Sequence, residues 1–254
     1  MDVVIFCGGR GTRLAEKTEI VPKPLVPIGE KPILWHIMKT YEHFGHKRFI
    51  LTLGYKGEMI KDYFVKYPWL HCSFEINSRN AVFPTCAEDW SVLLKETGEK
   101  STTGKRLNLV KADIKTSPFL ATYGDGLADI DINKVIDLHN KMKKEHGTIA
   151  TVVVTHPKIK YGVIKEKDGI ALDFNDKAVL GEWINIGFMV LEQDVFRYIK
   201  DNEMDYEALK AMAAEKKLAV FKHSGFFASM DTYKDYVDLN AMWKDKSPWK
   251  VWKD

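Results

Sequence analysis

The run DVVIFCGGRGTRL, residues 2–14, joins a short apolar segment to a loop rich in glycine. Residues 2–7 are mostly apolar and partly β-branched, which favours a buried strand, and Gly8 and Gly9 end it. In open parallel sheets, ligands bind beyond the carboxyl ends of the strands. The sequence therefore predicts a parallel sheet with a candidate ligand loop directly after its first strand.

Strand-like and helix-like segments alternate outward from this run, which is typical of βαβ units. Further strands are expected over 48–55, 119–126, 148–156 and 182–192, and helices over 32–45, 57–67 and 131–147. Within 161–174, the Asp168-Gly169 pair separates two strand-like runs, which predicts an antiparallel hairpin. We expect a single α/β domain over residues 1–254: a three-layer, mostly parallel, Rossmann-like sheet with helices on both faces, a small antiparallel sheet inserted over it, and two or three closing helices.

Composition excludes several classes of partner. The chain has 254 residues, 45% hydrophobic and 29% charged, with a net charge of +3. Its basic residues are spread along the whole sequence, so we expect no nucleic-acid-binding or membrane-binding tail. No apolar run reaches the roughly 20 residues that a membrane-spanning helix needs. A small anionic ligand remains compatible with this charge.

Three cysteines, Cys7, Cys72 and Cys86, are present without CxxC spacing. The chain opens on a strand-like run and not on the charged and apolar regions of a secretion signal. We therefore expect a cytoplasmic protein with reduced thiols, without a disulfide scaffold and without a structural zinc site.

The loop from Gly8 to Lys23 contains residue types that bind phosphate. Gly8, Gly9 and Gly11 can take positive φ and bring backbone N–H groups close to an anion, and Arg13 can bind phosphate oxygens in bidentate fashion. Lys23 lies between two prolines that fix the backbone around a single cation. A tight turn with solvated basic side chains is the alternative. The spacing matches neither GxxxxGK[ST] nor GxGxxG.

A second loop, YGDGLADID (123–131), follows the strand part of 119–126, which covers residues 119–123. Asp125 lies between two glycines there, and a carboxylate beside phosphate oxygens suits Mg²⁺. An acidic turn is the alternative, and Asp131 fits the cap of the next helix better than a ligand.

Several segments together resemble the sugar-1-phosphate nucleotidylyltransferases, and among them the glucose-1-phosphate cytidylyltransferases. These are GGRGTRL to KPL (8–25), GEKPILWHIMK (29–39), GYKGEMIKDYF (54–64), ETGEKSTTGKRL (96–107), TYGDGLADID (122–131), MDT (230–232) and PWKVW (248–252). The resemblance extends nearly from end to end. It implies a glycosyltransferase-A-like fold, in which residues 1–130 mainly bind nucleotide and residues 131–254 mainly bind the acceptor and supply the last helices.

The reaction that this resemblance implies is the transfer of CMP from CTP to a sugar 1-phosphate, with Mg²⁺ as cofactor, giving a CDP-sugar and pyrophosphate. The sugar phosphate would attack the α-phosphorus in line with the leaving group, without a covalent intermediate or a general base. The family is also often oligomeric, so a homo-oligomer is expected.

Residue roles follow from the same resemblance. Nucleotide contacts would come from Gly8, Gly9, Gly11, Thr12, Thr103, Arg106 and Asp125. Arg13 and Lys23 would bind the phosphates and act as the catalytic cations. Asp125 and Asp231 would hold Mg²⁺, Lys177 would face the sugar phosphate, and Trp183 and Asn185 the sugar.

The acceptor segments depart from the pattern of the family. Asp176 and Ala178 stand where glutamate and proline are common, Ile186 replaces a glycine, and Phe227 stands where a tryptophan is usual. A side chain at position 186 can fill space that a hexose would occupy, so a cytidylyltransferase for a different phosphorylated acceptor is an alternative. A non-catalytic nucleotide or sugar sensor is a second one, although a sensor has no need for Arg13, Lys23, Asp125 and Asp231 together.

Overall fold

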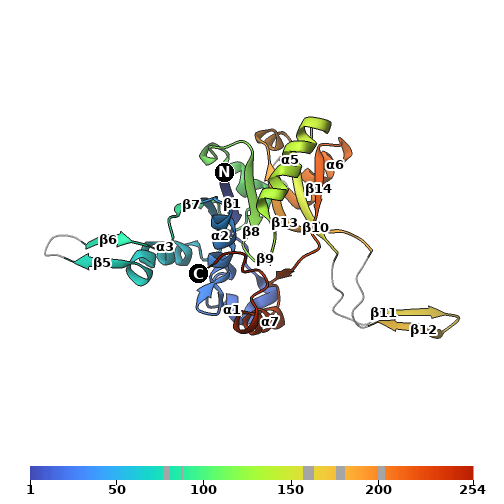
Figure 1. Cartoon of the computed structure of the whole chain (residues 1–254), viewed down its shortest axis with the longest axis horizontal. Helices are drawn as coiled ribbons and strands as arrows, with labels where there is room; N and C mark the ends of the chain where they lie inside the picture. The colour runs from blue at the N-terminus through green and yellow to red at the C-terminus, as the bar shows by residue number, and fades with distance from the viewer. Residues whose placement is uncertain (77–80, 87, 157–162, 176–180, 200–203, 254) are drawn as a thin grey trace.

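A seven-stranded sheet forms the centre of the protein in a computed structural model (Figure 1). The structure describes residues 1–76, 81–86, 88–156, 163–175, 181–199 and 204–253. In spatial order the strands are β14 (Leu218–Lys222), β10 (Ala150–Thr155), β13 (Ile184–Leu191), β8 (Phe119–Tyr123), β1 (Asp2–Phe6), β4 (Arg48–Leu53) and β7 (Ser91–Glu96). The strand predicted over residues 2–7 is thus confirmed as β1, near the middle of the sheet.

One strand of this sheet runs against the others. β13 pairs antiparallel with both β8 and β10, whereas β1, β4, β7, β8, β10 and β14 pair in parallel with their remaining neighbours. The prediction of a mostly parallel sheet is confirmed. The apolar composition of 182–192 indicated a buried strand, but composition carries no information about strand direction.

Helices cover both faces of the sheet. Along β1, Val3 and Ile5 belong to one hydrophobic cluster, and Val4 and Phe6 to the other. The first cluster includes side chains of α2 (Ile33–His43), α3 (Gly57–His71), α5 (Ile132–His146) and α7 (Tyr233–Asp245). The second includes side chains of α4 (Thr103–Leu109), η4 (Gln193–Arg197) and α6 (Leu209–Ala214). The three-layer prediction is therefore confirmed.

Short elements connect and extend these layers. They are η1 (Thr12–Leu14), α1 (Ala15–Thr18), η2 (Lys23–Leu25), β2 (Pro27–Ile28), β3 (Lys31–Pro32), β5 (Ser73–Ile76), β6 (Ala81–Thr85), η3 (Lys111–Asp113), β9 (Gly126–Ala128), β11 (Val163–Lys167), β12 (Ile170–Asn175), η5 (Met204–Ala208) and β15 (Phe227–Ser229). β2 pairs with β3, β5 with β6, β9 with β15 and β11 with β12, each antiparallel.

The hairpin predicted within 161–174 is present as β11 and β12. Asp168 and Gly169 have φ of 54° and 80° at its turn, which is the backbone of the favoured two-residue hairpin turns. The hairpin extends away from the central sheet in Figure 1, and its strand side chains are largely exposed. The expectation that it lies over the sheet is therefore wrong.

The thiol prediction is also wrong for two of the three cysteines. Cys72 and Cys86 form a disulfide that joins the end of α3 to the residue after β6. Cys7 is buried and unpaired. This bridge could not be predicted, because the two cysteines lack CxxC spacing and the β5–β6 hairpin that brings them together has no clear pattern in the sequence. Among the described residues, no helix is both long and apolar enough to cross a membrane.

Candidate active site

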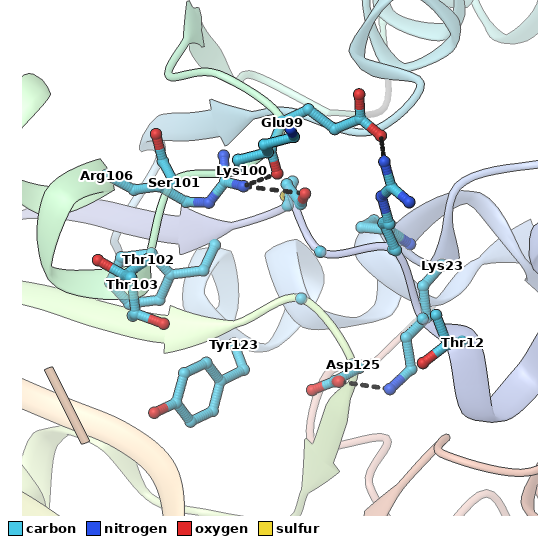
Figure 2. Close-up of a pocket in the computed structure, with 18 of the residues that line it drawn as sticks. Thr12, Lys23, Glu99, Lys100, Ser101, Thr102, Thr103, Arg106, Tyr123 and Asp125 are labelled. Carbon is cyan, nitrogen blue, oxygen red and sulfur yellow. Dashed lines mark hydrogen bonds and ion pairs between the residues drawn. The ribbon is translucent and has the colours of Figure 1, made fainter. Parts of the chain in front are cut away.

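A cavity of about 590 Å³ opens at the carboxyl edge of the sheet, where β1 and β8 end (Figure 2). It is lined by residues 6–13, Lys23, Pro24, residues 99–103, Arg106, residues 123–125 and Asp231. Every residue that the sequence predicts to contact nucleotide or metal lines this one cavity, although these residues come from five separate segments. The βαβ topology explains this convergence, because parallel strands deliver their following loops to the same edge.

The glycines of the first loop serve different purposes. Only Gly11 has a positive φ, of 60°. Gly8 is required for space instead, since a Cβ there would lie 2.0 Å from Nη1 of Arg106. A Cβ on Gly9 would meet no atom within 4 Å. At Gly8 the close approach of a buried arginine, and not a positive φ, is therefore what requires a glycine.

Arg106 holds the loops around the cavity together. Its side chain is buried, with Nη1 donating to the carbonyl of Leu53 at 2.9 Å and to Oγ1 of Thr97 at 2.7 Å. Nη2 donates to the carbonyls of Gly8 at 3.0 Å and Glu99 at 3.2 Å. Four of the five N–H donors of a guanidinium can be satisfied this way. Arg106 lines the cavity, but its four hydrogen bonds go to oxygens of the protein itself.

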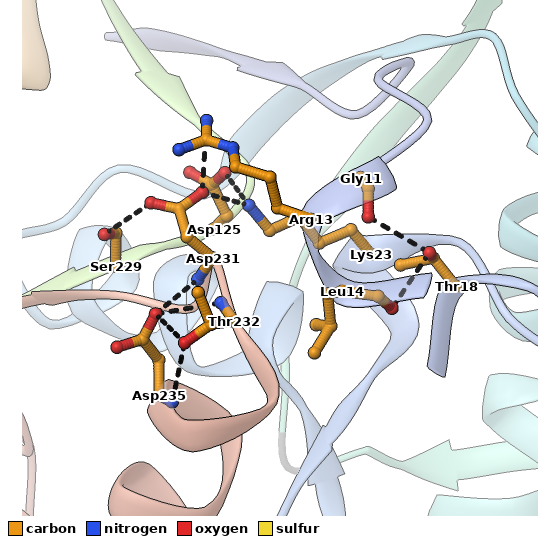
Figure 3. A network of polar contacts seen from close by, with 10 residues as sticks. All are labelled: Gly11, Arg13, Leu14, Thr18, Lys23, Asp125, Ser229, Asp231, Thr232 and Asp235. Atoms are coloured by element: carbon orange, nitrogen blue, oxygen red, sulfur yellow. Dashed lines mark hydrogen bonds and ion pairs between the residues drawn. The ribbon is translucent and has the colours of Figure 1, made fainter. Parts of the chain in front are cut away.

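Lys23 joins two carboxylates that are far apart in the sequence (Figure 3). Its Nζ donates to Oδ2 of Asp125 at 2.6 Å and to Oδ1 of Asp231 at 2.9 Å. The lysine side chain is only 12% exposed. Pro22 precedes it in extended backbone and Pro24 is buried, so Lys23 is not the solvated lysine of the alternative interpretation.

A small two-stranded sheet positions Asp231 beside the cavity. β15 pairs with β9, and the N–H of Met230 donates to the carbonyl of Asp125 at 2.9 Å. Helix α7 then begins with a capping box in which Thr232 and Asp235 cap each other. Oγ of Ser229 donates to Oδ2 of Asp231 at 2.9 Å, which leaves Oδ1 directed at Lys23. The sequence motif MDT is therefore held at both ends.

The ion pairs also shift the protonation equilibria of this cluster. Burial lowers the pKa of Lys23, but the Asp125 and Asp231 carboxylates outweigh it, so its pKa lies above the ordinary value. Burial raises the pKa of Asp231. Hydrogen bonds from Lys23 and Ser229 and the positive charge of Lys23 lower this pKa by more than burial raises it, so the net shift is downward. Lys23 and Asp231 are therefore both charged at neutral pH.

The donor set fits a Mg²⁺ ion that is held together with a nucleotide. Two carboxylates converge on one cation position, and Mg²⁺ is usually bound by one or two carboxylates plus phosphate oxygens and water. Across the residues that the structure describes, no cluster of three or more His, Cys, Asp or Glu side chains forms a metal cage. Asp125 and Asp231 would thus depend on the substrate for the remaining ligands.

The family profile described as Nucleotidyl transferase matches residues 2–246, nearly the whole chain. The chain belongs to the nucleotidyl transferase family. It is 44% identical over 262 residues to the glucose-1-phosphate cytidylyltransferase of Salmonella typhimurium, covering 99% of this chain and 100% of that protein. It is 42% identical over 258 residues to the "Probable glucose-1-phosphate cytidylyltransferase" of Bacillus subtilis, with the same coverage.

Solved structures support the fold of this nucleotidyl transferase. A UDP-glucose pyrophosphorylase complexed with UDP-glucose superposes with a TM-score of 0.67 at 19% identity, covering 96% of this chain and 98% of that chain. Such low identity supports the fold alone. The mixed central sheet with its small antiparallel sheets is the glycosyltransferase-A-like arrangement expected from the sequence.

Arg13 and Thr12 lie at the mouth of the nucleotidyl transferase cavity. The Arg13 side chain is 77% exposed, and its Nη2 lies 3.6 Å from Oδ1 of Asp231. Thr12 begins the short helix η1, and Thr103 begins α4 behind the N-cap Thr102. Arg13, Thr12 and Thr103 all line the cavity, where Arg13 is ion-paired with Asp231.

Sequence reasoning did not single out several other residues of the cavity. Arg10 forms an ion pair with Glu99 at 2.7 Å, which joins the glycine loop to the segment after β7. Lys100 and Tyr123 also line the cavity. All four lie inside or directly beside motifs used for the family resemblance, and that position was the available signal.

Two of the residues expected to bind the acceptor, Trp183 and Asn185, do not line this cavity. Trp183 packs its ring against His156 with 3.7 Å between the centroids, and Oδ1 of Asn185 accepts from the N–H of Gly187 at 2.9 Å. Lys177, Asp176 and Ala178 lie outside the described residues.

Two departures from the family pattern can be examined directly. Ile186 is 4% exposed and belongs to the hydrophobic core, and it does not line the cavity. Phe227 packs against the same core and close to Gly126. The expectation that the side chain of Ile186 fills ligand space is not supported, because Ile186 packs among apolar residues.

Proposed function

We propose that this nucleotidyl transferase transfers CMP from CTP to a sugar 1-phosphate, with glucose 1-phosphate as the first candidate, releasing pyrophosphate and a CDP-sugar. The proposal rests on one observation above all: one cavity contains a glycine loop, Lys23 and two convergent carboxylates. The names of the full-length relatives support cytosine as the base and glucose 1-phosphate as the acceptor.

The reaction needs positioning and charge neutralisation more than proton transfer. An oxygen of the sugar phosphate forms a bond to the α-phosphorus of CTP while the bond to the β-phosphate oxygen breaks in line with it. The attacking phosphate is already ionised near neutral pH, so no side chain has to remove a proton. Bound Mg²⁺ supplies a further positive charge to the phosphates that it contacts.

Four groups would carry the nucleotide chemistry. Arg13 and Lys23 are the catalytic cations that bind the phosphates as negative charge moves onto pyrophosphate. Asp125 and Asp231 hold the Mg²⁺ ion. Gly8, Gly9, Gly11, Thr12 and Thr103 contact the nucleotide along the floor and rim of the cavity.

Acceptor binding is proposed from sequence together with strand direction. Because β13 is antiparallel, its first residues pair with the carboxyl end of β10, where Ile184 lies opposite Thr155. Trp183 and Asn185 therefore lie at the edge of the sheet that also bears the cavity. We assign them to the sugar and Lys177 to its phosphate. A different phosphorylated acceptor is the alternative, supported by Asp176, Ala178 and Phe227.

Two further parts of the proposal concern the surroundings of the enzyme. Exposed apolar side chains on α3, β5, β11 and β12 favour self-association into a homo-oligomer. A cytoplasmic location also remains a prediction. The Cys72–Cys86 disulfide argues against the reduced thiols from which that location was inferred.

The decisive experiment measures pyrophosphate release by the purified protein with Mg²⁺ and glucose 1-phosphate, offering CTP, UTP, dTTP and ATP in turn. We expect release with CTP at least tenfold faster than with any other nucleotide, and none when EDTA is added. Release with UTP or dTTP instead would overturn the choice of base. CTP binding without pyrophosphate release would favour the alternative acceptor. No pyrophosphate release with any sugar phosphate of a wider panel would favour the sensor.

A further inference from the structure

The ammonium of Lys23 occupies the point where the two metal-binding carboxylates converge. Nζ lies 2.6 Å from Oδ2 of Asp125 and 2.9 Å from Oδ1 of Asp231, so one positive charge bridges both oxygens. The lysine side chain is 12% exposed, and the carboxylates are 29% and 27% exposed. This is a partly buried three-member cluster with a cation at its centre (Figure 3).

A divalent cation that bridged the same two oxygens would need the same place. Mg²⁺ lies about 2.0 to 2.1 Å from its oxygen ligands, which is closer to each carboxylate than the present ammonium. Two cations within about 4 Å repel each other strongly in a partly buried site. The present position of Nζ and a bridging Mg²⁺ therefore exclude each other.

The neighbourhood offers the lysine a second position. Lys23 also lines the cavity in which the nucleotide phosphates are proposed to bind. Pro22 and Pro24 restrict its backbone, so the move belongs to the flexible four-carbon side chain. An ammonium that leaves the carboxylates needs another anion, and a triphosphate supplies one.

We propose that Lys23 is a placeholder for the divalent cation. Its ammonium holds Asp125 and Asp231 together and leaves them only when it can form ion pairs with nucleotide phosphates instead. This inference rests on the proposed metal site. Binding of the cation then favours binding of the nucleotide and the reverse, since the cation displaces the Lys23 ammonium from the carboxylates and the nucleotide phosphates accept it. Lys23 thereby also has a role before the reaction, besides its contact with phosphate during it.

Arg13 provides a matched comparison for this role. It is a second cation of the same cluster, but its Nη2 lies 3.6 Å from Asp231 only, and its side chain is 77% exposed. Removing Arg13 therefore removes one positive charge from the site without clearing the position between the carboxylates.

The test measures Mn²⁺ binding without nucleotide, by the electron paramagnetic resonance signal of free Mn²⁺. We expect Lys23→Met to bind Mn²⁺ at least tenfold more tightly than the unaltered protein, and Arg13→Met less than threefold more tightly. Adding Asp125→Asn to Lys23→Met should return binding to the weak level, which locates the ion. Circular dichroism and thermal unfolding verify the fold, and Lys23→Gln replaces Lys23→Met if the methionine variant does not fold.

Two failures are distinguishable. If Lys23→Met and Arg13→Met bind Mn²⁺ equally, while Asp125→Asn still weakens binding, the placeholder role is overturned and the metal site stands. If Asp125→Asn and Asp231→Asn leave Mn²⁺ binding unchanged, both in the otherwise unaltered protein and in Lys23→Met, the metal site is overturned and this inference with it.

Discussion

Two arginines contact different groups of Glu99, one from a buried and one from an exposed position. Nη2 of Arg106 binds the Glu99 carbonyl from a buried position, whereas Arg10 binds the Glu99 carboxylate with a side chain that is 59% exposed. A buried guanidinium without its acceptors is costly, but an exposed ion pair gains little over water. The two residues should therefore differ in their effect on stability although both carry the same charge.

Arg106→Met should lower the free energy of unfolding by roughly 2 to 4 kcal/mol, because it removes four hydrogen bonds, three of them buried, that join separate loops. Arg10→Met, the matched control, should lower it by less than about 1 kcal/mol. Urea denaturation followed by circular dichroism measures both. Equal midpoints for the two variants would show that Arg106 does not hold the loops together.

Asp125→Asn should reduce the rate of pyrophosphate release at least a hundredfold, because the amide is a weaker ligand for Mg²⁺ than a carboxylate. Asp131→Asn is its control in the same loop. Asp131 caps α5 by accepting from the N–H of Lys134, and asparagine caps helices about as well. The control should keep its activity within about twofold. Substantial turnover by folded Asp125→Asn would remove the metal assignment.

At the scale of elements, the last residues of the chain are attached to α2 by an aromatic cluster. His36 on α2 contacts the rings of Trp35, Trp243, Trp249 and Trp252. Its Nε2 lies 3.0 Å from the carbonyl of Ile28, and Nε1 of Trp249 lies 3.4 Å from its Nδ1. The imidazole therefore donates through Nε2 and accepts through Nδ1, which requires the neutral ring.

Acidification should weaken this attachment. Burial lowers the pKa of His36 from 6.5 to about 4, so between these pH values the unfolded chain binds more protons than the folded one. The free energy of unfolding therefore falls as the pH drops through this range. His36→Gln should reduce the slope by up to about 1.4 kcal/mol per pH unit, the effect of one proton. Denaturant titrations from pH 7 to pH 4 measure the slope, and an unchanged slope would contradict the assignment.

Local patterns predicted some elements well and could not predict others. The Asp131 cap and the Asp168-Gly169 turn were recognisable because a few neighbouring residues decide them. The direction of β13 and the disulfide depend on partners distant in the sequence. The same holds for the hydrogen bonds of Arg106, whose acceptors come from separate loops, and for the contact of Lys23 with both carboxylates. Motifs predicted which residues line the cavity, but not which of them bind each other.

At the scale of the whole molecule, two hairpins extend from opposite ends of the long axis in Figure 1. On β11 and β12, Ile164, Ile170, Leu172 and Phe174 are between 57% and 67% exposed. Ile164 lies opposite Phe174, but the register shifts between Lys165 and Glu166, so Leu172 is an extra residue of β12 and Ile170 lies opposite Lys167. Ile164 and Phe174 therefore form one apolar face, which would gain from burial against a second copy of the chain.

Phe174→Glu should lower the molar mass measured by multi-angle light scattering, because it places a charge in this apolar face. Lys165→Glu is the control, since Lys165 pairs with Asp173 on the other face of the hairpin. The control should keep the mass of the unaltered protein. An unchanged mass for Phe174→Glu would exclude this face from the oligomer contact.

The reversed direction of β13 has a consequence for how this fold can diversify. The chain leaves the sheet at the carboxyl end of β10 and returns at the amino end of β13, and these two ends lie side by side, with Thr155 opposite Ile184. Everything between them is therefore a closed insertion with adjacent entry and exit points at the ligand edge. Such an insertion can be exchanged as a cassette while the pairing of all seven strands is preserved. Evolution or design could thus exchange this segment, which includes the proposed acceptor residues Lys177 and Trp183, independently of the cavity beside β1 and β8.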